Sequence, residues 1–319
     1  MFKSVSENIA EELSSRKNAR KGLRSFGISY LDDALLGIGA CDLVLLGASS
    51  GVGKTQLCCN IAFANISAGK RVHFLALEAE EYEIERRLKY QVIAAMFYAD
   101  PNRPNISNFS FDRWLLGDFI EPLQEYEDRA TEFMVNAYKD FFIFYKTSGF
   151  SINDLIENIV RHAPETDLFI IDHAHYFDFD DDNENRAMKT LAKTVRTLAL
   201  EERKPIILVA HLRKRDKANE DLVPGMDEFH GSSDLTKIAT KVITISSGSR
   251  LDDGCYETYI RIPKNRTNGT VTRFLGRLSF NPRKNSYDER YKVGRSNLTR
   301  KEGFAELDRG LQPEWCNRF

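Results

Sequence analysis

The chain has 319 residues, of which 42% are hydrophobic and 29% charged, and its formal net charge is −2. These values are ordinary for a globular protein, and they exclude a strongly basic chain that would hold a polyanion by its overall field. No stretch approaches ~20 consecutive apolar residues, and the start lacks the apolar core of a signal peptide. We therefore expect a cytoplasmic protein without a membrane partner. Five cysteines without a Cys-x-x-Cys pair favour neither a disulfide framework nor a zinc site.

The first 25 residues predict an amphipathic helix followed by a linker. Apolar side chains recur at helical spacing, namely Val5, Ile9, Ala10 and Leu13, and a polar, basic stretch follows over 14–21. Such a helix cannot bury its apolar face alone, so we expect it to dock on this domain or to bridge to a neighbouring subunit. A second short helix is expected over 30–36.

From residue 42 onwards, short apolar runs alternate with helical patterns. The candidate strands are 42–46, 72–77, 141–145, 167–172 and 205–210, and clear helical periodicity covers 152–160 and 185–203. This alternation predicts an α/β domain over 26–288 with a mostly parallel central sheet flanked by helices. Three later segments, 242–246, 256–262 and 270–280, predict antiparallel strands at the C-terminal edge of the sheet. Residues 213–230 are expected to form a polar loop, and 289–319 a surface tail.

Residues 47–55 read Gly-Ala-Ser-Ser-Gly-Val-Gly-Lys-Thr, directly after an apolar run. A strand, a turn of small residues and Lys-Thr opening a helix is the layout of a phosphate-binding loop, whose backbone N–H groups and helix N-terminus bind phosphate. Lys54 is expected to reach phosphate oxygens and the Thr55 hydroxyl to bind Mg²⁺, so ATP and Mg²⁺ are the expected cofactors. The alternative, a small-residue connector, does not explain the Lys-Thr. The predicted nucleotide-binding residues are Ala48, Ser49, Ser50, Gly51, Val52, Gly53, Lys54, Thr55 and Gln56.

Two carboxylates lie at the ends of predicted strands. Asp172 ends the run Leu168–Ile171, and we expect it to bind Mg²⁺ beside Thr55. Glu78 ends the strand over 72–77, where a carboxylate can polarise the water that attacks the γ-phosphate. The alternative is that Glu78 only complements the N-terminus of the following helix. Position alone leaves those two interpretations even.

His211 ends the strand over 205–210, and a basic run follows it at once. His211 can hydrogen-bond a γ-phosphate and sense its loss, although a structural histidine at a strand end is the commoner case. The basic run either contacts the phosphates of a nucleic acid or forms a solvated face, and its cations are Arg213, Lys214, Arg215 and Lys217. His173 and His175 lack metal-site spacing and are interpreted either as structural or as residues that support the site residues from behind.

A basic turn that ends in glycine, Ile262–Gly269, joins two of the late strands and contains Lys264 and Arg266. It can be a plain hairpin. It can also present Arg266 to the γ-phosphate of a neighbouring subunit, as an arginine finger does.

In this order the motifs resemble the ATPase domain of hexameric replicative helicases of the DnaB type, and the helicase half of phage and mitochondrial primase–helicases. The likeness runs from about residue 22 to about 288. It is carried by Gly27–Asp33, the Ala-first loop Ala48–Thr55, Ala76–Glu78, Asp172–His173, Ala210–Leu212, His230–Leu235 and Lys264–Gly269.

This resemblance implies a RecA-like fold and an ATP-dependent helicase. Glu78 would be the catalytic base, His211 the sensor, and Arg266 the finger in a turn shared with Lys264. The resemblance also implies a homohexameric ring around single-stranded DNA, with ATP sites between subunits. A primase, polymerase or loader protein would be a partner, in the cytoplasm of a bacterial or phage-infected cell.

Two other functions remain open at this stage. A RecA- or RadA-like recombination or annealing ATPase would assemble on DNA without unwinding it. An NTP-dependent switch would instead bind a protein partner and ignore nucleic acid.

Overall fold

A computed structural model of the chain describes residues 4–179, 183–213, 221–229, 233–288 and 290–316. One sheet of ten strands forms its centre, in the order β10-β8-β7-β6-β1-β5-β4-β2-β3, with β9 paired to β8. The strands are β1 (Leu43–Ala48), β2 (Val72–Ala76), β3 (Phe141–Tyr145), β4 (Leu168–Asp172), β5 (Ile206–His211), β6 (Lys241–Arg250), β7 (Tyr256–Asn265), β8 (Phe274–Asn281), β9 (Ser286–Tyr287) and β10 (Lys292–Arg295).

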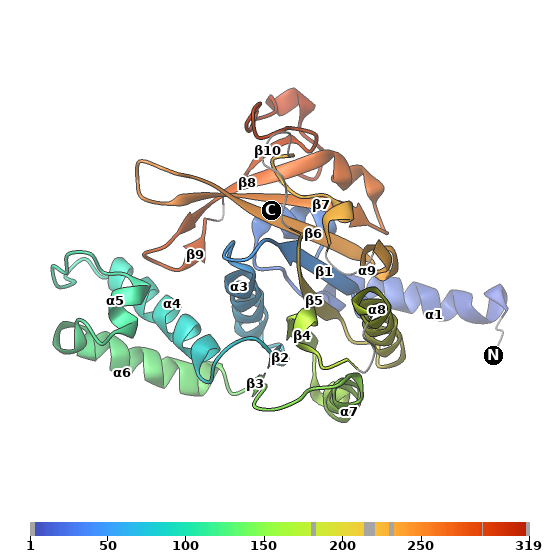
Figure 1. Ribbon diagram of the computed structural model, residues 1–319, viewed down its shortest axis with the longest axis horizontal. Coiled ribbons are helices and arrows are strands. Elements are labelled where there is room, and N and C mark those ends of the chain that lie inside the picture. Colours follow the sequence, from blue (N-terminus) through green and yellow to red (C-terminus); the bar gives the residue numbers. More distant parts are fainter. Residues whose placement is uncertain (1–3, 180–182, 214–220, 230–232, 289, 317–319) are drawn as a thin grey trace.

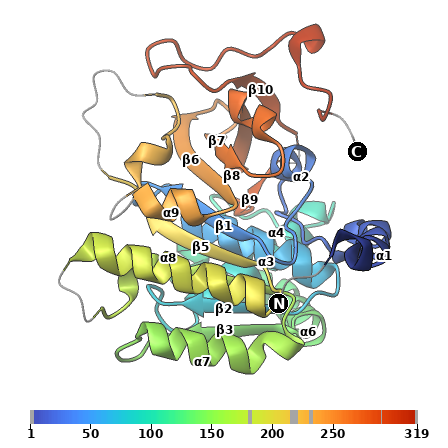
Figure 2. The same ribbon diagram turned by 90° about the vertical axis from the view of Figure 1, so that its right-hand side faces the viewer.

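The helices cover both faces of this sheet (Figure 1 and Figure 2). They are α1 (Val5–Lys17), α2 (Ser29–Leu35), α3 (Lys54–Ser67), α4 (Glu83–Ala99), α5 (Phe111–Leu115), α6 (Ile120–Ala137), α7 (Ile152–His162), α8 (Glu184–Glu201) and α9 (Ser233–Ile238). Short 3₁₀ turns are η1 (Ala19–Gly22), η2 (Ala163–Glu165), η3 (Ala174–Tyr176), η4 (Met226–Glu228), η5 (Gly269–Arg273) and η6 (Arg309–Leu311).

Strands β1, β2, β4 and β5 are buried along nearly their whole length, as their unbroken apolar sequences require. One layer of core packs α3 and α4 against the sheet, and the other packs α7 and α8 against its opposite face. All pairings among β1–β6 are parallel. The predicted α/β fold with a mostly parallel sheet is confirmed.

The late strands differ from the prediction in two details. The first of them, β6, pairs in parallel with β1, so antiparallel pairing begins only with its other neighbour, β7. Residues 270–273, which we expected to open a strand, instead form part of η5. The central position of β1 between β5 and β6 places the phosphate-binding loop at the carboxyl end of the sheet, where ligands bind in open α/β folds.

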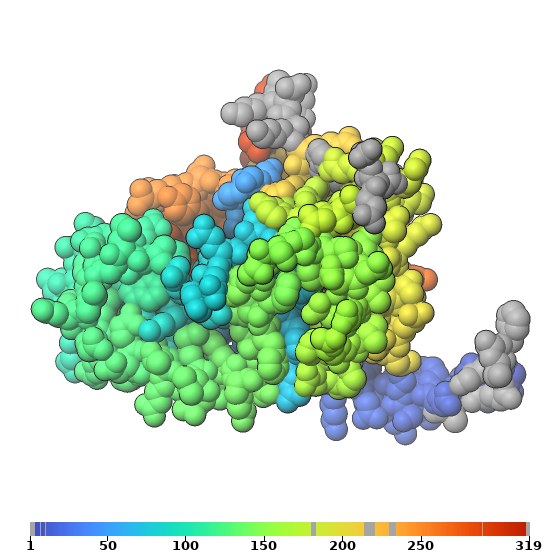
Figure 3. Space-filling view, turned by 60° about the horizontal axis from the view of Figure 1, so that its bottom comes forward, coloured from blue at the N-terminus to red at the C-terminus, as the bar shows by residue number. Residues whose placement is uncertain are grey.

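Two peripheral segments extend this body. Helix α1 projects from it (Figure 3), and its apolar residues Val5, Ile9 and Leu13 are 81%, 58% and 43% exposed. The C-terminal segment instead packs on the domain. Trp315 is buried against the ring of Tyr30, with ring centroids 5.6 Å apart.

Candidate active site

The loop after β1 has the backbone conformation that a phosphate-binding loop needs. Gly51 and Gly53 adopt φ of +78° and +98°, which L side chains rarely tolerate. Gly53 immediately precedes α3, so the free N–H groups of the first helical turn face the same space as the loop. A sulfate-sized anion could be bound there by backbone donors and by the helix dipole.

Lys54 lies inside the loop and is almost fully buried. Its ammonium donates to the carbonyl oxygens of Ala48 (3.3 Å) and Ser49 (3.2 Å) and to Nδ1 of His211 (3.0 Å). Burial lowers the pKa of Lys54, while the nearby Asp172 and Glu78 carboxylates act in the opposite direction. The lysine that sequence predicts to contact phosphate is therefore connected, in the nucleotide-free chain, to the histidine at the end of β5.

Thr55 and Asp172 meet although 117 positions separate them. The Thr55 hydroxyl donates to Oδ2 of Asp172 over 2.7 Å. The other oxygen, Oδ1, is buried and accepts no hydrogen bond from any described residue. Burial raises the pKa of Asp172 to about 6, against the opposing effect of the Thr55 hydrogen bond. A hydroxyl beside a carboxylate with an unused oxygen fits a hard divalent cation such as Mg²⁺, which prefers oxygen ligands.

Glu78 follows β2 and faces the end of β4. Its carboxylate oxygen Oε2 lies 2.8 Å from Nε2 of His173, and its Oε1 lies 3.5 Å from the hydroxyl of Tyr176. His173 accepts the N–H of His175 at Nδ1, which leaves the proton on Nε2, facing Glu78. Burial, followed by His211 and His175, lowers the pKa of His173 to about 2, so the ring is neutral. Nε2 of His173 makes no hydrogen bond with any described residue, so this neutral ring lies beside the Glu78 carboxylate without protonating it.

The phosphate-binding loop, Glu78 and His211 line one cavity of about 540 Å³ at the carboxyl ends of the parallel strands. Sequence reasoning anticipated most of its walls, but it missed Arg87, which pairs with Glu83 over 2.8 Å, and Tyr176. His173, interpreted from the sequence as a structural or supporting residue, lies beside Glu78. The sequence signal that could have indicated Arg87 is its spacing of four residues from Glu83 on one helix.

Other predicted residues make contacts elsewhere. Gln56 lines the cavity, but its side-chain amide donates to the carbonyl of Asn285. Lys264 donates to the carbonyls of Thr236 and Lys237 in α9. Arg266 is exposed.

Arg266 lies at the opposite edge of the sheet from the loop. Its N–H donates to the carbonyl of Thr240, and the N–H of Thr240 donates to that of Leu43, the first residue of β1. The loop begins at Ala48, the last residue of that strand. At about 3.3 Å per residue, the two lie a whole strand length apart. Within one chain, Arg266 and Lys264 are therefore not part of the cavity.

The basic loop is described only at its two ends. Arg213 is exposed, its N–H donates to the carbonyl of Glu228, and Leu212 forms an isolated bridge with Phe229. Lys214, Arg215 and Lys217, which we predicted to contact DNA, lie outside the described residues. The root of the loop is thus only two residues from His211.

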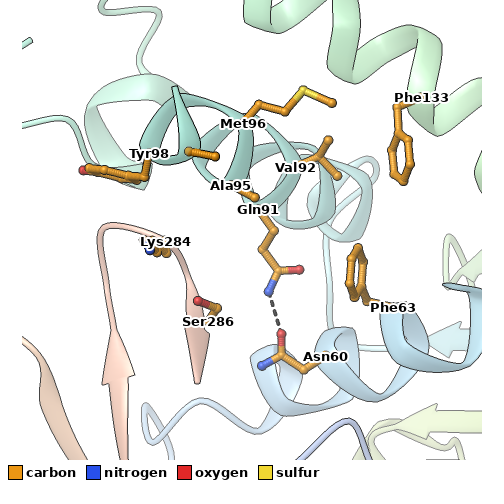
Figure 4. Close-up of a pocket in the computed structure, with 11 residues that line it drawn as sticks. Asn60, Phe63, Gln91, Val92, Ala95, Met96, Tyr98, Phe133, Lys284 and Ser286 are labelled. Atoms are coloured by element: carbon orange, nitrogen blue, oxygen red, sulfur yellow. Dashed lines mark hydrogen bonds between the residues drawn. The ribbon is translucent and has the colours of Figure 1, made fainter. Parts of the chain in front are cut away.

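A second cavity, of about 470 Å³, lies between α3, α4, α6 and the turn leading into β9 (Figure 4). Its wall is mostly apolar, from Phe63, Val92, Met96 and Phe133, and Gln91 donates to Asn60 across its base over 2.6 Å. None of its lining residues belongs to the phosphate-binding loop.

A phosphate-binding loop, a hydroxyl–carboxylate pair and a second carboxylate at the carboxyl edge of a mostly parallel sheet define an ATPase domain of the RecA-like class. The chain belongs to the family described as DnaB-like helicase C terminal domain, whose pattern matches residues 22–289.

Individual relatives agree with this assignment. A probable plasmid replicative DNA helicase of Chlamydia trachomatis serovar L2 is 23% identical over 272 residues, which is 84% of this chain and 55% of the relative. The chain thus spans about half the length of that protein. No helix among the described residues combines the length and hydrophobicity needed to cross a bilayer.

Two solved structures share the fold. One, described as an ATPase domain, superposes with a TM-score of 0.71 at 16% identity, over 90% of this chain and 99% of its own. A DnaB-like replicative helicase, described together with its interactions with primase, superposes with a TM-score of 0.68 at 16% identity, over 90% of this chain and 67% of its own.

Proposed function

We propose that this protein is an ATP-dependent DNA helicase that moves along single-stranded DNA as a ring of identical subunits, in replication. Family membership gives the class of activity. The observation that carries the proposal is the contact between Thr55 and Asp172, because it joins the loop to a buried carboxylate as metal-assisted phosphoryl transfer requires. A primase, polymerase or loader protein is the expected partner.

Each residue has a distinct role in hydrolysis. The loop N–H groups and Lys54 would bind the phosphates, and Thr55 and Asp172 would hold Mg²⁺. The metal supplies neutralisation of the charge that develops on the phosphate oxygens. Glu78 accepts a hydrogen bond from the attacking water, and the neutral His173 lies 2.8 Å from that carboxylate without supplying a proton to it.

The site is completed by the next subunit. Arg266 cannot reach the cavity of its own chain, yet it is exposed at the opposite edge of the sheet. Lys264 lies two residues before Arg266. Its ammonium donates to two carbonyl groups at the C-terminal end of α9, and this fixes the turn that carries Arg266. Head-to-tail packing brings such an edge against the neighbour's cavity, and repeated around a closed ring it gives every site an arginine.

Helix α1 supplies a second contact between subunits. Its apolar residues Val5, Ile9 and Leu13 lie on one face and are exposed. The apolar cavity between α3, α4 and α6 is the matching surface, and we infer that α1 of a neighbouring copy covers it. Ile9→Asp should shift the protein from rings to smaller species in sedimentation velocity, whereas Ser14→Asp, which adds the same charge off the apolar face, should not.

Hydrolysis is transmitted to DNA through β5. His211 contacts Lys54, and two residues later the chain enters the basic loop. Departure of the γ-phosphate changes the hydrogen bonds of Lys54 and His211, and this moves the root of the loop that carries Arg213 and the following cations. Each cation removed from contact with a phosphate of single-stranded DNA should reduce the slope of log K against log salt by ~0.7.

Mixed rings test this proposal. Arg266→Ala and Lys54→Ala should each lower ATPase activity, the former by roughly a thousandfold, while Arg273→Ala, an exposed cation of the adjacent turn, should not. When the two inactive chains are assembled together, a Lys54→Ala subunit can still donate Arg266 to the intact loop of its neighbour. Random assembly at equal amounts then restores about a quarter of the sites.

The two alternatives give different results in the same preparation. A helicase separates a forked DNA duplex with ATP, whereas an annealing or recombination ATPase only protects the single strand from nuclease. A protein-binding switch would show ATPase activity that does not respond to an added oligonucleotide. No recovery of activity in mixed assemblies would exclude a site shared between subunits.

A further inference from the structure

Two histidines and a carboxylate converge at the amino-terminal edge of the sheet, away from the phosphate-binding loop. His73 is the second residue of β2, His162 is the last residue of α7, and Glu165 ends η2. Each side chain places one potential ligand atom within 4.8 Å of the others. Nδ1 of His162 lies 3.0 Å from Oε1 of Glu165, and the rings of His73 and His162 stack with centroids 5.0 Å apart.

A buried threonine sets the tautomer of His73. The hydroxyl of Thr166 donates to the carbonyl of His162 over 2.6 Å, so its oxygen is left to accept the N–H of His73 at Nδ1, 2.8 Å away. The lone pair of His73 is then on Nε2. Histidines that bind metals commonly donate their second N–H in this way, which fixes the ring and strengthens the ligand.

The surroundings keep His73 available as a ligand. The ring is 8% exposed and stacks on Phe142.

The other two ligands face an accessible space. A cavity of about 280 Å³ lies against His73, His162 and Glu165, and the side chains of the latter two are 36% and 46% exposed. Arg71 approaches only the other carboxylate oxygen of Glu165, Oε2, at 3.7 Å. A cation can therefore enter from solvent and retain water ligands.

We propose that His73, His162 and Glu165 form a binding site for a divalent transition-metal ion, Zn²⁺ above all. Two imidazoles and one carboxylate suit zinc and exclude a preference for Mg²⁺ or Ca²⁺, which take oxygen ligands. The cysteines, from which the sequence argued against zinc, do not take part. Bound metal joins the end of α7 to β2 and leaves one coordination position for water. This site is independent of the nucleotide site and of the proposed helicase activity.

Calorimetric titration of the chelator-treated full chain with zinc chloride tests the proposal. The double variant His162→Ala/Glu165→Gln should lose one zinc site, and neither substitution is at a buried side chain. Glu157→Gln, which removes an exposed carboxylate elsewhere on α7, should bind as the unmodified chain does. Zinc should also raise the melting temperature of the unmodified chain and of Glu157→Gln by more than it raises that of the double variant.

Two further variants remove ambiguity. Glu78, His173 and His211 form another cluster of potential ligands in the nucleotide cavity, so the titration is repeated with Glu78→Gln, in which the proposed site must survive. Thr166→Val should weaken zinc binding about 10–100-fold by freeing the tautomer of His73. A zinc stoichiometry that is unchanged in the double variant, or that falls only with Glu78→Gln, would overturn the proposal. So would the absence of any binding.

Discussion

Replacing Asp172 by asparagine should stabilise the metal-free, nucleotide-free protein while it abolishes Mg²⁺-dependent hydrolysis. Burial raises the pKa of Asp172 from its ordinary value of 3.8 to about 6. Because the pKa of Asp172 is higher in the folded than in the unfolded chain, the free energy of unfolding is highest at low pH, where the carboxyl is protonated in both states. It falls as the pH rises through about 6, where the buried group ionises. At ~1.4 kcal/mol per pKa unit, the buried anion lowers the free energy of unfolding by about 3 kcal/mol near neutral pH.

The asparagine removes that charge and keeps an oxygen that can accept from Thr55. Its amide NH₂ takes the place of Oδ1, which has no hydrogen-bond partner among the described residues. These buried donors would then be unsatisfied, which costs about 1 kcal/mol or more. The free energy of unfolding of Asp172→Asn should then exceed that of the unmodified chain by about 1–2 kcal/mol at about pH 7.5. This difference should shrink by about 1.4 kcal/mol at about pH 5, where about half of the destabilisation by the Asp172 anion is gone.

Urea denaturation of both proteins in chelator, at both pH values, measures this difference. Asp128→Asn, a change at an exposed carboxylate of α6, serves as the control and should show no pH-dependent difference. An Asp172→Asn protein that is equally stable or less stable by the same amount at both pH values would refute the reasoning, because Asp172 would then carry no desolvation penalty.

Three further changes probe the catalytic group and the packing around it. Glu78→Gln should lower single-turnover hydrolysis by roughly 10²–10⁴-fold with nucleotide affinity nearly unchanged; an equal loss of affinity in a fluorescent-nucleotide titration would contradict a role as base. Gly47→Ala should destabilise the domain by about 1–3 kcal/mol in urea denaturation, because its new methyl group would lie 2.4 Å from Cζ of Phe229; unchanged stability would mean that Phe229 moves away without cost. Trp315→Ala should cost about 3–5 kcal/mol by removing a buried ring that packs on Tyr30; a melting temperature equal to that of the unmodified chain would show that the C-terminal segment is dispensable.

The sequence predicted those features that depend on local patterns. The strand before Ala48, the glycines at positive φ and the helix opened by Lys54 are adjacent in the chain, so one stretch of sequence specifies them. The meeting of Thr55 with Asp172 followed because Asp172 ends β4 and Thr55 opens the helix after β1, at the same carboxyl edge of one parallel sheet.

What the sequence could not give depends on residues that come together from distant strands. His173 lies 2.8 Å from Glu78, which is 95 positions earlier in the chain. This proximity can be predicted only when the pairing of β2 with β4 is known. The same pairing brings His73 near His162 and Glu165, which an argument from cysteine spacing could not detect. The position of Arg266 across the sheet from the loop required the pairing of β6 with β7.

The projecting helix α1 has a consequence for experiments in dilute solution. A helix of 13 residues is marginal in water without a surface to pack on, and Val5, Ile9 and Leu13 remain open to solvent here. The helical content of the first twenty residues should therefore increase with protein concentration, as a second copy becomes available. Circular dichroism at successive dilutions would then report self-association, without a label and without nucleotide.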